Sequence, residues 1–229
     1  MYLIILIFCF FVFLYILHYI AREDFVITRK DIHMDKIFNM AFLTGFFSLF
    51  VSRVFFVLFH PELKFLNPVG FLAFPYFPGL SLIGGIIGGA IFVYFYSEYR
   101  KMPNGKMLDL FILSLIGTLP VGFIVTFILL LGKTGALFNF LFVFSVLLSI
   151  IFKTIFYPFS SKGEIRDGTL GLIFIALFSF LYFLTKMFLN IKMFSFLDPE
   201  NLLLLISLFS ALILILNQEK MNNFLGKNE

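Results

Sequence analysis

The chain has 229 residues, of which 61% are hydrophobic, 21% aromatic and only 13% charged. Soluble domains are about half apolar and about a quarter charged, so this composition excludes a soluble protein and predicts a membrane protein. One Cys cannot form an internal disulfide, and the three His show no metal-ligand spacing, so we expect neither a metal nor a cofactor. The net charge of +4 is spread over short loops, which argues against nucleic-acid binding.

Seven apolar runs are close to the roughly 20 residues that one bilayer crossing requires. They predict an all-α, polytopic membrane protein with about seven transmembrane helices, forming a single integral membrane domain over residues 1–229. The first run lacks a preceding basic residue and a following cleavage site, so it is predicted to remain as the first helix. The predicted helices span about 2–20, 37–59, 79–97, 108–131, 136–157, 169–189 and 201–216.

The basic residues predict which side of the membrane each loop occupies, because cytoplasmic loops are enriched in Lys and Arg. Alternate loops and the C-terminal tail carry eleven of the 17 basic residues, and the opposite loops carry three. The N-terminus is therefore predicted to lie outside and the C-terminus in the cytoplasm. The eleven are Arg22, Arg29, Lys30, Lys36, Arg100, Lys101, Lys106, Lys162, Arg166, Lys220 and Lys227, against Lys64, Lys133 and Lys192.

The segment 60–78 contains four Pro and many Phe, so it is predicted to be an irregular stretch in the outer membrane interface. Arg53 precedes it and is the only charged residue well inside a predicted span. A guanidinium near the bilayer centre costs about 3 kcal/mol on insertion scales, so it requires a partner or a polar cavity. Two interpretations stay open: Arg53 snorkels outward or pairs with Glu62, or it binds an anion such as a phospholipid phosphate.

A glycine-rich stretch follows in the third predicted helix, where Gly84, Gly85, Gly88 and Gly89 form overlapping small-x-x-x-small pairs after Ser81. Such glycines allow close approach of another helix, or of a lipid headgroup, to the backbone. We expect an outward-opening cavity there, lined by these residues and Arg53.

Three further polar residues have structural interpretations. Asp109 is expected at the start of the fourth helix, where free N–H groups favour a carboxylate. Lys153 and Lys186 are expected to snorkel to the membrane surfaces.

Several segments together resemble the bacterial prolipoprotein diacylglyceryl transferase family. SRVFFVLFHPE (52–62) is similar to that family's Gly-Ala-Arg segment and places Arg53 on its arginine. GLSLIGGIIGGAI (79–91) resembles its Gly-Met-Ser-Phe-His-Gly-Gly motif, and KMPNGKMLDL (101–110) resembles the following stretch, with Asp109 on the aspartate. KGEIRDGTLGLIFIALFSF and DPENLLLLISL resemble its last two helices.

The resemblance implies transfer of the diacylglyceryl group of phosphatidylglycerol to the lipobox cysteine of a prolipoprotein. It also marks departures at family polar positions. Ile83 replaces the family's histidine, and GFIVTF (122–127) keeps Gly122 while Phe123 replaces an arginine. A late family arginine is represented only by Lys186, about a turn or more away.

Two hypotheses follow from these matches and departures. The chain is either a divergent transferase of the bacterial inner membrane, or a non-catalytic protein that binds lipid or lipoprotein on the same scaffold. The first would bind a phosphatidylglycerol-like lipid and a prolipoprotein signal peptide, with substrate contacts from Arg53, Ser81 and the four glycines and supporting roles for Asp109 and Gly122. A small-solute transporter is a further alternative, against which the lack of repeats and of intramembrane acids argues.

Overall fold

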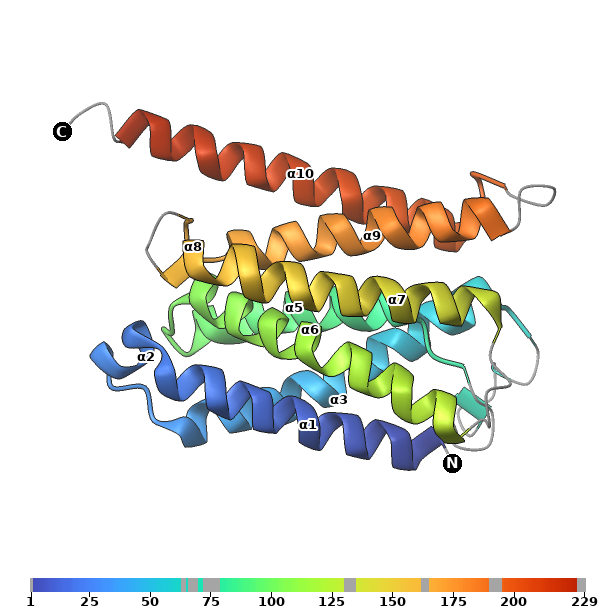
Figure 1. Cartoon of the computed structure of the whole chain (residues 1–229), viewed down its shortest axis with the longest axis horizontal. Coiled ribbons are helices and arrows are strands. Elements are labelled where there is room, and N and C mark those ends of the chain that lie inside the picture. The colour runs from blue at the N-terminus through green and yellow to red at the C-terminus, as the bar shows by residue number, and fades with distance from the viewer. Residues whose placement is uncertain are drawn as a thin grey trace. The chain divides into compact units, whose positions relative to one another are not determined.

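The computed structural model describes residues 2–62, 65, 70–71, 79–129, 135–161, 165–189 and 195–225 (Figure 1). Over these residues the regular secondary structure is entirely helical, which confirms the all-α prediction. Within the same residues seven helical spans are long and apolar enough to cross a membrane, as predicted. They are Leu3–Glu23, Met34–Phe59, Leu82–Tyr99, Asn104–Leu129, Ala136–Phe159, Thr169–Leu189 and Pro199–Gln218. The sides on which the termini lie stay a prediction.

The chain divides into two compact units, residues 1–134 and 135–229, and each is described by itself. The interpretation of the whole chain as one integral membrane domain stays a prediction.

Among its described residues, the first unit contains four long helices and the short helix α2. Its pairs are α3 with α5 and α1 with α6, and α5 also packs on α6. Buried Leu17, Met40, Val93 and Met107 join these helices in one apolar core. The bounds are α1 (Tyr2–Glu23), α2 (Phe25–Arg29), α3 (Met34–Phe59), α5 (Leu82–Tyr99) and α6 (Asn104–Leu129).

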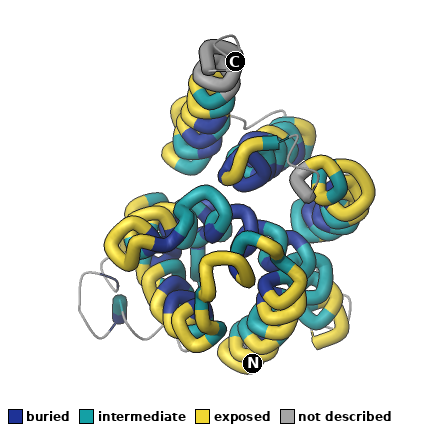
Figure 2. The backbone as a smooth tube through the Cα atoms, turned by 90° about the vertical axis from the view of Figure 1, so that its left-hand side faces the viewer, coloured by how far each residue is buried: buried dark blue, intermediate teal, exposed yellow. Residues whose placement is uncertain are grey.

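Many positions of these helices are exposed (Figure 2), and large apolar residues occupy many of them. Phe11, Phe46 and Phe95 are each more than half exposed. A water-soluble protein rarely exposes so much contiguous apolar surface. In a chain with seven potential spans, the same surface is suited to contact with lipid tails.

The short helix α2 was not predicted, and one carboxylate organises it. Asp24 caps α2, because its Oδ1 accepts the N–H groups of Val26 at 2.9 Å and Ile27 at 3.3 Å. Its Oδ2 lies 2.8 Å from Lys106 Nζ. The first loop is thereby joined to the start of α6 on the predicted cytoplasmic side.

The second unit contains α7 and the pair α9 and α10, which run side by side (Figure 1). The observed α9 has the predicted bounds, and α10 is longer than the predicted 201–216. The elements are α7 (Ala136–Ile151), the π-helical stretch η2 (Phe152–Phe156), α8 (Tyr157–Ser161), α9 (Thr169–Leu189) and α10 (Pro199–Leu225).

The helices α5 and α6 begin a few residues away from the approximate starts predicted from the sequence, for identifiable reasons. The helix α5 begins at Leu82 and not at residue 79, because Gly79 has φ +153° and Ser81 caps the helix. The helix α6 begins at Asn104 and not at residue 108, since the Pro103 carbonyl already accepts the Met107 N–H at 3.0 Å. In α6, helical hydrogen bonding therefore starts before the first strongly apolar residues.

Candidate functional site

Arg53 lies near the end of α3 with only 3% of its surface exposed. Its guanidinium donates to three backbone carbonyls: Nε to Phe71 at 2.9 Å, Nη1 to Gly79 at 2.7 Å and Nη2 to Gly70 at 3.1 Å. The three acceptors belong to the chain just before α5. Arg53 therefore fixes this part of the backbone against the end of α3.

Two aromatic rings also face the Arg53 guanidinium. The Cζ atom lies 4.9 Å from the ring centre of Phe65 and 5.7 Å from that of Phe56, within the range of cation–π attraction. Among the described residues no carboxylate forms an ion pair with Arg53, so the pairing with Glu62 considered from the sequence is not observed. A guanidinium has five N–H groups, and three are donated to carbonyls. Among the described residues, the two other N–H groups of Arg53 have no acceptor, and its positive charge has no carboxylate partner.

Ser81 and Ser52 hold the start of α5 against α3, one residue from Arg53. The Ser52 hydroxyl donates to the Ser81 carbonyl at 2.7 Å, and the Ser81 N–H donates to the Ser52 carbonyl at 3.1 Å. The Ser81 hydroxyl oxygen accepts the Gly84 N–H at 3.2 Å, which caps the helix. Ser81 is thus a buried capping residue in this structure.

The four glycines of α5 all face α3. A Cβ atom at Gly84 would lie 2.9 Å from Phe55, and one at Gly88 would lie 2.6 Å from Val51. At Gly85 and Gly89 the nearest atoms would be 3.4 Å and 3.7 Å away, which is ordinary contact. Helix packing accounts for this face, and α3 fills the space in which we expected these glycines to line a cavity.

Gly79 occupies a position that no other residue fits. Its φ of +153° is unfavourable for side chains, and a Cβ atom would overlap the Phe56 ring. Its carbonyl also accepts the 2.7 Å bond from Arg53 Nη1.

We expect Gly79→Ala to lower the free energy of unfolding by about 1–3 kcal/mol, because the new methyl group strains the backbone and displaces Phe56. Gly135→Ala is the matched control, since Gly135 has φ −71° and a Cβ atom there would meet no described atom within 4 Å. Thermal unfolding in one detergent, followed by circular dichroism, measures both. Equal melting temperatures for the two variants would contradict the steric explanation.

The remaining predicted site positions in the first unit are buried or close to neighbours. Asp109 is 2% exposed and is the sixth residue of α6, so its predicted place at the helix start is wrong. Gly122 allows close approach of α1, because a Cβ atom there would lie 3.1 Å from Cys9 Sγ. Ile83 is fully buried and Phe123 is half-buried, so neither position offers a polar group.

A polar cluster in the second unit was missed from the sequence. Lys186 Nζ lies 2.7 Å from Glu200 Oε2 and 3.3 Å from Asp198 Oδ2, and this ion pairing was not predicted. The snorkelling of Lys186 to the membrane surface stays a prediction. The Tyr182 hydroxyl donates to Glu200 Oε1 at 2.9 Å. The sequence signal that could have indicated this pairing is a basic residue in the last turn of one helix followed by two acids at the start of the next.

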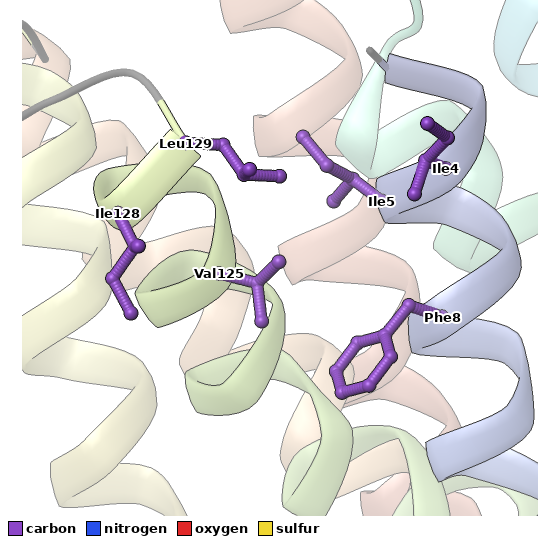
Figure 3. Close-up of a pocket in the computed structure, with 6 residues that line it drawn as sticks. All are labelled: Ile4, Ile5, Phe8, Val125, Ile128 and Leu129. Atoms are coloured by element: carbon purple, nitrogen blue, oxygen red, sulfur yellow. The ribbon is translucent and has the colours of Figure 1, made fainter.

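An apolar groove of about 290 Å³ lies between α1 and α6 (Figure 3). Only hydrocarbon lines it, so it can accommodate acyl chains but cannot perform chemistry. Its lining residues are Ile4, Ile5, Phe8, Val125, Ile128 and Leu129. Within the described part of the chain no group of His, Cys, Asp and Glu is arranged to bind a metal ion.

These features define a multi-pass membrane protein with a buried, firmly oriented arginine near the end of one of its helices. Residues 1–217 of the 229 match the prolipoprotein diacylglyceryl transferase family, and the chain belongs to that family. The family implies a transferase-like function in lipoprotein biosynthesis, with lipid and prolipoprotein substrates in general. No curated protein and no solved structure matches the chain significantly.

Proposed function

We propose that this protein transfers the diacylglyceryl group of a phosphatidylglycerol-type lipid to the lipobox cysteine of a secreted prolipoprotein. The reaction takes place at the outer face of the bacterial inner membrane. A sulfur–carbon bond forms at the lipid glycerol as the bond from that carbon to the phosphate oxygen breaks. The thiol proton leaves with the glycerol phosphate, so the atoms and charges balance without a cofactor.

The observation that carries this proposal is the state of Arg53. It is buried, and among the described residues its charge has no carboxylate partner and two of its N–H groups are uncommitted after three carbonyl bonds. Buried charges are normally compensated by an opposite charge. A phosphate would supply that charge and accept both free N–H groups, and the interaction would strengthen as negative charge develops on the leaving group.

We infer that Ser81 and the four glycines contribute to this function by setting the distance between α3 and α5. Reciprocal hydrogen bonds between Ser52 and Ser81 support this role, as do the short distances from Gly84 and Gly88 to α3. They keep the start of α5 beside the guanidinium, where the lipid headgroup would bind. Asp109 and Gly122 support the same unit from α6.

A non-catalytic lipid- or lipoprotein-binding protein on this scaffold is the second candidate. Ile83 and Phe123 favour it, because apolar side chains stand where the family has histidine and arginine. Neither can take the thiol proton or hold the leaving phosphate.

Complementation separates the two candidates. A bacterium depleted of its own transferase is supplied with this chain or with Arg53→Ala, and labelled lipid on prolipoprotein is measured. We expect label from the wild-type chain and a loss of about tenfold or more in the variant, as for removal of one charge-stabilising donor. Absence of label despite membrane insertion of the wild-type chain would reject the transferase and favour the binding protein.

A further inference from the structure

The polar cluster of the second unit shares no residue with the Arg53 site and has its own charge balance. Lys186 contacts two carboxylates, those of Asp198 and Glu200. Glu200 uses one oxygen for Lys186 and the other for the Tyr182 hydroxyl. One cation beside two carboxylates leaves a net charge of −1. The cluster is therefore rich in acceptors, whereas Arg53 offers donors.

Asn201 follows Glu200 in α10 and carries an unsatisfied acceptor. It is 2% exposed, and its Nδ2 donates to the Ser195 carbonyl at 2.8 Å. The same carbonyl accepts the Asp198 N–H at 3.3 Å, so the Asn201 amide nitrogen and the Asp198 N–H share one acceptor. The Ser195 carbonyl oxygen can only accept a hydrogen bond, so the amide nitrogen of Asn201 must face it. The remaining amide atom of Asn201 is then the oxygen Oδ1. Among the described residues, that buried oxygen has no hydrogen-bond partner.

A buried acceptor without a donor is rare in native proteins and indicates a missing water, ion or ligand. Here the missing group must donate hydrogen bonds, and the net charge of −1 favours a cation over an anion such as phosphate. The side chain of Asp198 is 43% exposed, so the cluster opens to the surface at that residue. Lys186 and Glu200 lie deeper, at 13% and 19%.

From this geometry we infer that the end of α9 and the start of α10 bind a primary ammonium group, such as an ethanolamine headgroup carries. Its three N–H groups would be accepted by Asn201 Oδ1 and by the carboxylates of Asp198 and Glu200. This site goes beyond the proposed transfer reaction and does not depend on it, because it uses none of the residues around Arg53.

Two lipids that differ only in the substituents on the headgroup nitrogen test this inference. Phosphatidylethanolamine and phosphatidylcholine with the same acyl chains carry the same formal charges, but the trimethylated headgroup has no N–H donor. Their binding to the purified full-length protein in detergent is compared by native mass spectrometry. We expect a preference of about tenfold for phosphatidylethanolamine, the effect of one satisfied buried acceptor. Equal binding of the two lipids would overturn the inference and leave water as the partner of Asn201.

Substitutions test whether Asn201 causes the preference for phosphatidylethanolamine. Asn201→Leu should bring the two lipids to within about twofold of one another, whereas Ser207→Ala should keep the preference. Ser207 is the matched control, a buried polar residue of the same helix whose hydroxyl is already bonded to Ser179 at 2.7 Å. If Asn201→Leu does not fold, Asp198→Asn replaces it, because this more exposed change should weaken phosphatidylethanolamine binding several-fold. A preference that persists in the folded variants would overturn the site.

Competition with free ethanolamine tests whether the ammonium group belongs to a lipid or to a soluble amine. Displacement of the lipid by millimolar ethanolamine would support a soluble amine as the ligand. Retention of the lipid, together with the preference over phosphatidylcholine, would support a lipid-borne amine.

Discussion

Arg53→Met is expected to lower the free energy of unfolding by about 3–5 kcal/mol, the range for removing one partner from a buried charged interaction. The change leaves the carbonyls of Gly70, Phe71 and Gly79 without their donor and also removes the cation–π contacts. Met fills much of the same volume, so the loss of hydrogen bonds and charge is isolated from the loss of packing. Thermal unfolding in detergent, followed by circular dichroism, measures the effect.

Arg53→Lys should be intermediate, because an ammonium keeps the charge but cannot reproduce the planar fork that reaches three carbonyls. Arg100→Met is the matched control for the loss of an arginine. Arg100 is exposed, and its described contacts are with the side chains of Tyr96 and Tyr99. Its replacement should stay within about 0.5 kcal/mol of the wild type. If Arg53→Met and Arg100→Met lowered the free energy of unfolding by similar amounts, the stabilising role of the hydrogen bonds from Arg53 to the carbonyls would be contradicted.

The second large effect is expected at the contact between α3 and α5, where neighbouring glycines give opposite predictions. Gly88→Ala should destabilise the protein by about 1–3 kcal/mol, because its methyl group would lie 2.6 Å from Val51 Cβ and force the helices apart. Gly89→Ala makes the same chemical change where the nearest atom is 3.7 Å away, and it should be tolerated. The difference between the two melting temperatures is the measurement.

A second pair checks that distance, and not the residue's place in α5, decides the outcome. Gly84→Ala should be harmful because Phe55 lies 2.9 Å away, and Gly85→Ala should be mild because its nearest neighbour is at 3.4 Å. If all four variants melted alike, the close approach of α3 and α5 would not be what the glycines provide.

The spans were predictable from the sequence because hydrophobicity and length alone define a membrane crossing. The bounds of α9 were predicted to the residue, and the family was recognisable from several ordered motifs. Helix starts were less predictable. At α5 the cap of Ser81 and the backbone of Gly79 set the start, and at α6 the hydrogen bonding of Pro103 extended the helix before its apolar run.

The candidate site was only partly predictable, since it depends on contacts between residues far apart in the chain. The sequence identified Arg53 as an unusual charge inside a span, but it assigned the four glycines to a cavity, whereas they pack against α3. It did not indicate that three backbone carbonyls would hold the guanidinium, because carbonyl positions have no sequence signature. The ion pairs of Lys186 were also missed, although the acids of the next helix lie only 12 and 14 residues away.

The central proposal is that Arg53 holds the phosphate of a phospholipid. The most direct test compares binding of phosphatidylglycerol with binding of diacylglycerol carrying the same acyl chains, in the wild type and in Arg53→Gln with verified helical content. We predict a wild-type preference for the phosphate-bearing lipid of about tenfold or more, falling to about twofold or less in the variant. An unchanged preference in Arg53→Gln, or no preference in the wild type, would contradict the proposal.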